Sequence, residues 1–262
     1  MAEKQSNKKK KRIIIGVIIA ILCIQGPLTW AIQSGRLFTQ GNKAAYSVAN
    51  TEPKSDSKLS GKTIIFLGSS VTYGSASHGE SFVDYLEKID GITAVKEALS
   101  GTTLVDKSVW GKKSYIARMK SIDPNIPADA FVVQLSTNDA TMKKPLGTIS
   151  ESFSKEDFDT QTVAGAIEYV IAYARETWDC PVIFFTGTQY KNEHYAQMVD
   201  LLLEIQKKWD IGVLDLWNDP EMNAVSAEDY KLYMVNSIHP SRIGYRDWWT
   251  PKFESYLSDY LK

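Results

Sequence analysis

The feature that most constrains the fold is a regular alternation between short, β-branched apolar runs and longer segments of helical periodicity. Five runs have the length and composition of buried strands, namely Thr63 to Leu67, Thr93 to Leu99, Ala130 to Leu135, Pro181 to Thr186 and Ile211 to Leu216. Helical patterns fall between them at Ser81 to Ile89, Ser114 to Ile122, Thr160 to Trp178 and Glu193 to Trp209. Because crossovers between parallel strands are right-handed, this series predicts an α/β fold with a parallel sheet of about five strands and helices on both faces.

Two further helix signals follow the last predicted strand. Ser226 and Asp229 have the spacing of a capping box that begins a short helix, and Ser241 to Leu261 has the pattern of a terminal helix. The chain contains 44% hydrophobic and 11% aromatic residues, which is ample for one large core. Residues 62–262 are therefore predicted to form a single domain.

The segment before this domain has the pattern of a membrane anchor. The stretch from Ile13 to Ile32 carries no charge, and its length matches the thickness of the bilayer core. It directly follows a basic tail, residues 1–12. The positive-inside rule keeps the tail cytoplasmic and predicts a signal anchor in the plasma membrane, with the domain on the extracytoplasmic side. A cleaved signal peptide and a secreted domain are the alternative, because Ile13 to Ile24 also resembles an h-region. Residues 33–61 are polar, lack apolar periodicity and are predicted to be a linker.

The charge distribution argues against a nucleic-acid partner. Residues 1–12 carry six basic side chains and one acidic side chain, a net charge of +5, which leaves −6 for the rest of a chain whose formal net charge is −1. Proteins that bind nucleic acids depend on basic contacts to phosphate, and the predicted domain lacks such an excess.

Polar loops follow several of the predicted strands. They are Gly68 to Gly74, Ser100 to Thr103, Ser136 to Asp139 and, after the last strand, Asn236 to Pro240. Since ligands bind at the carboxyl edge of open parallel sheets, we expect these loops to converge there. Together they contain a serine, a histidine, an asparagine amide and backbone N–H groups, which are the groups that acyl transfer needs as nucleophile, base and oxyanion donors.

The four loops resemble the SGNH or GDSL hydrolases, a family named for residues of separate sequence blocks. GSSVTYG is similar to the first block with Ser70 as nucleophile, and LSGTTL is similar to the second with Gly101. STND is similar to the third block with Asn138, and NSIHPS is similar to the fifth with His239. The resemblance covers roughly residues 62–260 and implies an esterase-type hydrolase on a flavodoxin-like, three-layer α/β/α fold.

The resemblance also implies roles for these residues. Ser70 Oγ would attack an ester carbonyl, and His239 would act first as general base and then as general acid in a two-step acyl transfer. The oxyanion hole would consist of the N–H groups of Ser70 and Gly101 and the side-chain amide of Asn138. This chemistry requires neither a metal nor an organic cofactor.

One catalytic position departs from the family pattern. Asn236 stands three residues before His239, where the family usually has the aspartate that orients the imidazole. Three interpretations stay open. Asn236 or a backbone carbonyl orients the histidine in a Ser–His dyad; an aspartate such as Asp215, Asp219 or Asp247 replaces it; or the site is degenerate and the chain is a membrane-anchored binding protein.

The predicted location bears on the substrate. A domain tethered outside the membrane through Ile13 to Ile32 favours esters fixed in the envelope, and our first hypothesis is removal of O-acyl (acetyl) groups from a cell-envelope glycan. Hydrolysis of lipid or lysophospholipid esters is the alternative. The connection from Ala140 to about Asp159 is long for a βα loop, and we expect it to overhang the site.

Overall fold

The computed structural model describes residues 39–107, 109 and 111–262. The predicted basic tail, residues 1–12, and the predicted anchor, Ile13 to Ile32, lie outside the described residues. Within residues 39–262, apart from 108 and 110, no helix has both the length and the apolar character needed to cross a bilayer.

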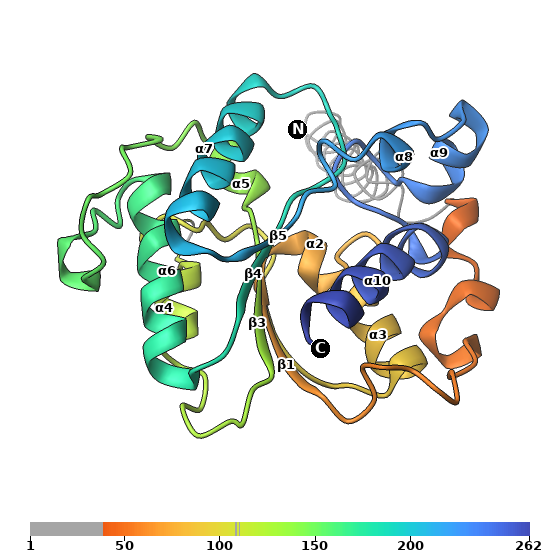
Figure 1. The fold of residues 1–262 in the computed structure, drawn as a ribbon. Coiled ribbons are helices and arrows are strands. Elements are labelled where there is room, and N and C mark those ends of the chain that lie inside the picture. Colours follow the sequence, from red (N-terminus) through yellow and green to blue (C-terminus); the bar gives the residue numbers. More distant parts are fainter. Residues whose placement is uncertain (1–38, 108, 110) are drawn as a thin grey trace, which may run out of the picture.

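Five parallel strands form one sheet through the middle of the domain (Figure 1). They are β1 (Thr63–Gly68), β2 (Thr93–Ala98), β3 (Ala130–Gln134), β4 (Val182–Phe185) and β5 (Gly212–Leu214). Their order is β2-β1-β3-β4-β5, and every neighbouring pair is parallel. This is the flavodoxin-like order, whose switch point lies between β1 and β3. The predicted parallel five-stranded α/β fold is confirmed.

Helices cover both faces of the sheet (Figure 1). One face carries α4 (Tyr115–Met119), α5 (Thr137–Thr141), α6 (Val163–Trp178) and α7 (Glu193–Trp209). The other carries α2 (Ser70–Tyr73), α3 (Phe82–Asp90), α8 (Pro220–Asn223), α9 (Ala227–Tyr233) and α10 (Thr250–Tyr260). Successive side chains of β1 alternate between two buried clusters, Ile65 and Leu67 in one and Ile64 and Phe66 in the other. A strand that is buried on both faces has a nearly continuous run of apolar residues in its sequence.

The predicted terminal helix is divided into two parts. Gly244–Trp249 winds as a π-helical turn, and α10 continues from Thr250. Aromatic packing holds this end of the chain on the sheet, since the ring of Phe253 stacks on Phe82 with centroids 3.8 Å apart. Trp249 is fully buried beside them. The terminal helix is thus fixed against the α3 side of the sheet.

Residues 39–61 differ from the linker that their polar composition predicts. Short 3₁₀ turns occupy Gln40–Asn42, Ala44–Tyr46 and Val48–Asn50. Asn42, Ser47 and Leu59 are buried, and the side-chain amide of Asn42 donates to the backbone oxygen of Ala76 at 2.7 Å. Hydrogen bonds rather than an apolar stripe hold this segment on the domain, which is why the sequence pattern does not reveal it.

The connection between α5 and α6 also differs from the expected overhanging lid. Figure 1 shows it running along the outside of α6, away from the central sheet. The backbone N–H of Ser150 donates to the buried carboxylate of Glu168 at 2.9 Å, and Lys208 Nζ donates to the Ser150 oxygen at 2.6 Å. Because α6 and α7 supply these partners, the connection is part of the helical layer.

Candidate active site

Ser70 is placed by the junction between the first strand and a short helix. It is the first residue of α2 and follows β1 at its carboxyl end, next to the switch point of the sheet. The α2 helix ends after one turn, because Gly74 takes a left-handed conformation with φ of 81°. Ser70 is 8% exposed, so its hydroxyl lies in a largely dry environment.

Gln134 at the end of β3 fixes the start of α2. Its Oε1 accepts hydrogen bonds from the backbone N–H groups of Ser69 at 2.9 Å and Thr72 at 3.2 Å, and from Thr72 Oγ1 at 2.9 Å. A Cβ on Gly68 would lie 1.9 Å from that hydroxyl oxygen, so only glycine fits there. Sequence analysis missed Gln134, although a polar residue inside a buried strand is itself a signal.

The structure brings His239 to Ser70, which lies 169 positions away in the chain. His239 Nε2 and Ser70 Oγ are 2.7 Å apart, and His239 Nδ1 is 3.0 Å from Asn236 Oδ1. The three side chains therefore form a relay that runs from the Ser70 hydroxyl to the His239 imidazole and on to the Asn236 amide. Such a nucleophile, base and orienting group is the arrangement that activates a serine.

The Asn236 amide fixes the tautomer of the imidazole. Its Oδ1 also accepts the backbone N–H groups of Ile238 at 3.0 Å and His239 at 2.9 Å. A flipped amide would point its NH₂ group at these two donors, so the oxygen must face the ring. Nδ1 of the neutral imidazole then carries the proton, and Nε2 is the acceptor that faces Ser70. The orientation that an aspartate usually provides is thus supplied by a neutral amide.

The three alternative aspartates are engaged elsewhere. Asp215 accepts a hydrogen bond from Thr186 Oγ1 at 3.0 Å. Asp219 caps α8 and pairs with Lys252 at 2.9 Å, and Asp247 pairs with the arginine before it at 2.6 Å. Asn236 is therefore the predicted orienting residue that the structure places at the imidazole.

The predicted oxyanion donors lie on neighbouring loops. Gly101 follows β2 in a left-handed conformation with φ of 80°, and Asn138 lies in α5 directly after β3. Asn138 Nδ2 donates to the backbone oxygen of Thr102 at 2.8 Å, which ties the two loops together. Because an amide nitrogen has two hydrogens, Asn138 can hold the loop with one and donate to an oxyanion with the other.

Asp139 anchors the loop that carries Gly101. Its fully buried carboxylate accepts the backbone N–H groups of Leu104 at 2.7 Å and Val105 at 3.0 Å. Desolvation raises the pKa of Asp139, while hydrogen bonds from these groups and from Ser136 oppose the increase. Asp139 was not among the predicted residues, although its place next to Asn138 in the same block is a usable signal.

Arg118 connects the ends of β1 and β2 with the Gly101 loop. Its Nη2 donates to the Gly68 oxygen at 2.8 Å and to Thr102 Oγ1 at 3.1 Å. Its Nη1 donates to the backbone oxygen of Glu97 at 3.0 Å and to its carboxylate at 2.9 Å. The residue Arg118 is 5% exposed, and its guanidinium holds three segments together at the catalytic edge of the sheet. Nothing in its local sequence indicates this role.

Two spaces are lined by chain neighbours of the site residues, and neither is lined by Ser70, Gly101, Asn138 or His239. A shallow hollow of about 250 Å³ lies beside α2 and is lined by Tyr73, Ser75, Ala76, His78 and Gly79. A second cavity of about 10 Å³ is lined by Val71, Thr137 and Ile238, the chain neighbours of the catalytic candidates, and by aromatic side chains. In the described part of the chain, no three His, Cys, Asp or Glu side chains are grouped so as to hold a metal ion.

Solved structures share this fold. A protein from Lactobacillus plantarum is 20% identical over 77% of this chain and 98% of its own, with a TM-score of 0.64. The acetyl xylan esterase AlAXEase is 15% identical over 74% and 98% of the two chains, with a TM-score of 0.52. A carbohydrate acetylesterase family member from Sinorhizobium meliloti is 15% identical over 76% and 97%, with a TM-score of 0.50. No curated protein matches the chain.

A family model matches the segment that contains the whole candidate site. The GDSL-like Lipase/Acylhydrolase family matches residues 66–246, which begin within β1 and end after His239. This span includes both catalytic candidates and the loops of Gly101 and Asn138. Since it covers well over half of the sequence, the chain belongs to the GDSL-like Lipase/Acylhydrolase family.

Proposed function

We propose that this protein is a serine esterase that hydrolyses carboxylic esters through an acyl-enzyme on Ser70. The observation that carries the proposal is the relay in which His239 Nε2 lies 2.7 Å from Ser70 Oγ while Asn236 holds Nδ1 at 3.0 Å. A histidine with this tautomer presents the lone pair of Nε2 to the hydroxyl and can take its proton.

The reaction proceeds in two halves. Ser70 Oγ attacks the ester carbonyl carbon as its proton passes to His239 Nε2, and the carbonyl oxygen becomes an oxyanion. His239 then gives that proton to the leaving alkoxide as the carbon–oxygen bond breaks, which leaves the acyl group on Ser70. Water repeats the sequence on the acyl-enzyme, with His239 as base, and releases a carboxylic acid and the original serine.

The oxyanion is assigned to the N–H groups of Ser70 and Gly101 and to Asn138 Nδ2. Loss of one such donor typically costs about 10²- to 10³-fold in kcat. Asp139 and Arg118 act behind these donors, because they hold the Gly101 loop through its backbone and through Thr102.

An O-acetyl group on a glycan is the substrate that we propose. The cavity beside Val71, Thr137 and Ile238 measures about 10 Å³, which is room for one group the size of a water molecule. A methyl group matches that size and a long acyl chain does not. The open hollow that includes the exposed ring of Tyr73 offers an aromatic surface for a sugar. Two similar structures are named as an acetyl xylan esterase and a carbohydrate acetylesterase family member.

Covalent labelling and a chain-length series test the proposal. We expect a fluorophosphonate probe to label wild-type protein at Ser70 and to leave Ser70→Ala unlabelled. Hydrolysis of aryl esters should be fastest for acetate and should fall sharply beyond a few carbons. A preference for long acyl chains would favour the lipid esterase alternative. Absence of both labelling and short-chain hydrolysis would favour the binding-protein alternative.

For the location we propose a single membrane anchor at Ile13 to Ile32. Between Ile32 and Thr39, the first residue that the structure describes, a chain of this length can span at most about 25 Å. An anchored domain would therefore act close to the membrane surface, where envelope polymers are attached. Alkaline extraction of cell membranes tests the anchor, since an anchored chain stays in the pellet and a cleaved, secreted chain is found in the medium.

A further inference from the structure

We propose that residues 39–48, which precede the family-matched segment, position the catalytic residues of this esterase. We call them the brace. They join the nucleophile loop, residues 74–80, to the histidine loop, residues 236–242. Asn42 is the main positioning residue of the brace. The inference rests on the esterase function proposed above, and the experiment below separates the failure of one from the failure of the other.

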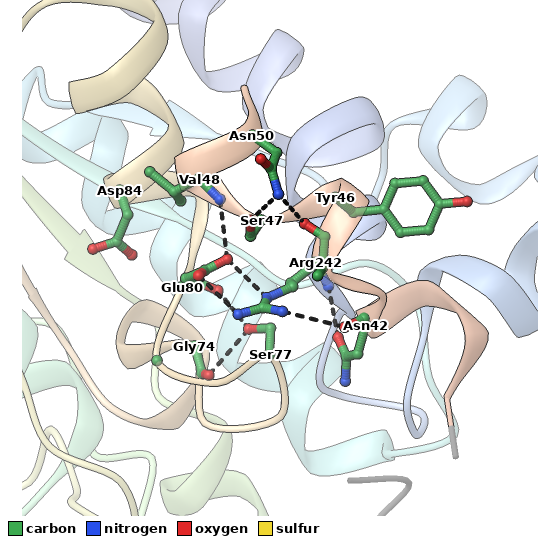
Figure 2. Close-up of polar contacts among 12 residues, drawn as sticks. Asn42, Tyr46, Ser47, Val48, Asn50, Gly74, Ser77, Glu80, Asp84 and Arg242 are labelled. Atoms are coloured by element: carbon green, nitrogen blue, oxygen red, sulfur yellow. Dashed lines mark hydrogen bonds and ion pairs between the residues drawn. The ribbon is translucent and has the colours of Figure 1, made fainter. Parts of the chain in front are cut away.

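Asn42 bridges the two loops with a single side-chain amide. Its Nδ2 donates to the backbone oxygen of Ala76 at 2.7 Å, and its Oδ1 accepts the backbone N–H of Arg242 at 2.9 Å. Ala76 lies six residues after Ser70, and Arg242 lies three residues after His239. Asn42 is 9% exposed, so water competes little for these bonds. Figure 2 shows Asn42 beside Arg242.

An ion pair connects the same loops beside this amide. Arg242 Nη2 donates to Glu80 Oε1 at 2.8 Å, and Arg242 Nε lies 2.8 Å from Glu80 Oε2 (Figure 2). The brace closes the network, because the Val48 N–H donates to Glu80 Oε2 at 3.1 Å and Arg242 Nη1 donates to the backbone oxygen of Asn42 at 3.3 Å. Both charged side chains are mostly buried, at 15% and 22% exposure.

Close packing fixes the brace against the segment after His239. A Cβ on Gly41 would lie 2.0 Å from the Leu232 oxygen and 2.3 Å from Ser241 Oγ. Ser241 follows Pro240 and donates its own hydroxyl to the Leu232 oxygen at 2.7 Å. The brace can therefore occupy only one position against this segment, and its contacts fix the position of the histidine loop.

This position matters because Ser70 and His239 come from segments without a common strand or helix. A displacement of about 1 Å between reacting groups can cost about 10²-fold in rate. Two ties between the two sides do not involve brace residues: the Arg242–Glu80 ion pair and Tyr245 OH, which donates to the Val71 oxygen at 2.7 Å. Loss of Asn42 should therefore loosen the alignment of Ser70 and His239 without moving the two side chains out of contact. We expect kcat to decrease about 10- to 100-fold.

The test uses the full chain and a matched pair of variants. Asn42→Ala removes both bridging bonds. Asn50→Ala removes an amide that donates to the Ala44 oxygen at 2.7 Å and to Ser47 Oγ, both within the brace. We expect Asn42→Ala to lower kcat and the rate of fluorophosphonate labelling about 10- to 100-fold with KM within about threefold. Asn50→Ala should stay within about twofold of wild type in both.

Additional variants separate positioning from stability. Asn42→Asp keeps the acceptor for Arg242 but loses the donor to Ala76, so an intermediate rate is expected. Glu80→Gln removes the charge from the ion pair and keeps one side-chain oxygen that can accept from the Val48 N–H. This variant should also lower kcat, and it serves as the test if Asn42→Ala does not fold. A positioning role lowers the plateau of the pH–rate profile without moving its acid limb.

Two results would overturn the inference, and they are distinguishable. If wild type labels while Asn42→Ala and Glu80→Gln label as fast as Asn50→Ala, the brace contributes only stability and the esterase proposal stands. If wild type neither labels nor hydrolyses esters, the esterase proposal fails and the inference falls with it.

Discussion

Replacement of Asn236 by aspartate is the most direct test of the relay. Asn236 Oδ1 accepts from His239 Nδ1 and from the backbone N–H groups of Ile238 and His239. A carboxylate oxygen accepts the same three bonds, so the turn should keep its shape. What changes is the charge next to the imidazole. We therefore expect Asn236→Asp to raise kcat, because the transition state carries an imidazolium that the ground state lacks.

The magnitude follows from the distance and the exposure of the pair. Two unit charges at about 4 Å attract by about 1 kcal/mol in water and by about 4 kcal/mol at an effective dielectric constant of about 20. Asn236 is exposed and lies 3.0 Å from the ring nitrogen, so the lower part of this range applies. A gain of about 1 to 2 kcal/mol corresponds to an increase of about 5- to 30-fold in kcat.

The assay is steady-state hydrolysis of a short-chain aryl ester as a function of pH. KM should change little. A carboxylate beside an imidazole favours its charged form, so the acid limb of the kcat/KM profile should move to higher pH in Asn236→Asp. Asn236→Ala is the control, and it should lose activity because it removes the acceptor that selects the tautomer.

Two outcomes would refute this argument. An unchanged or lower kcat in Asn236→Asp would show that the charge at this position does not stabilise the transition state. A gain of about 10⁴-fold would show that the wild type holds the wrong tautomer, since that is the scale of defect seen when a triad aspartate becomes an amide.

Other expected outcomes concern the support of the site. Gly68→Ala should destabilise the fold by about 1 to 3 kcal/mol in urea unfolding, because its Cβ would lie 1.9 Å from Thr72 Oγ1, whereas Gly187→Ala meets no atom closer than 3.7 Å and should be nearly neutral. Since burial raises the pKa of Asp139, the folded state binds its proton more readily than the unfolded state. Wild type should therefore gain stability relative to Asp139→Asn as the pH is lowered toward the ordinary pKa of an aspartate, and a constant difference would contradict this. Burial raises the pKa of Cys180 to about 11, so peptide mass spectrometry should find it alkylated by iodoacetamide at about pH 8 only after unfolding.

The fold could be predicted because parallel strands leave a strong sequence signal. A strand buried on both faces needs apolar side chains at every position, as in β1 and β3. The edge strand β5 shows the limit of this signal. The apolar run from Ile211 to Leu216 predicts a longer strand than the Gly212–Leu214 that pairs with β4.

The supporting residues could not be predicted in the same way. Gln134, Asp139 and Arg118 bond mainly to backbone groups of segments distant in the chain, and backbone partners leave no trace in residue type. Asn42 is harder still, because it lies in a polar segment whose composition is that of a linker. A buried polar residue can be recognised from sequence only when its surroundings are apolar, as they are for Gln134.

The four predicted loops converge for two different physical reasons. Ser70, Gly101 and Asn138 follow β1, β2 and β3, so the parallel sheet brings them to one edge. His239 has no such cause, because β5 ends at Leu214 and two helices intervene before the histidine loop. Its position is set by side-chain ties such as Arg242 to the nucleophile loop and by the packed terminal helix. We therefore expect substitutions in the sheet to alter folding and the oxyanion donors together, whereas substitutions in these ties should change the Ser70–His239 alignment first.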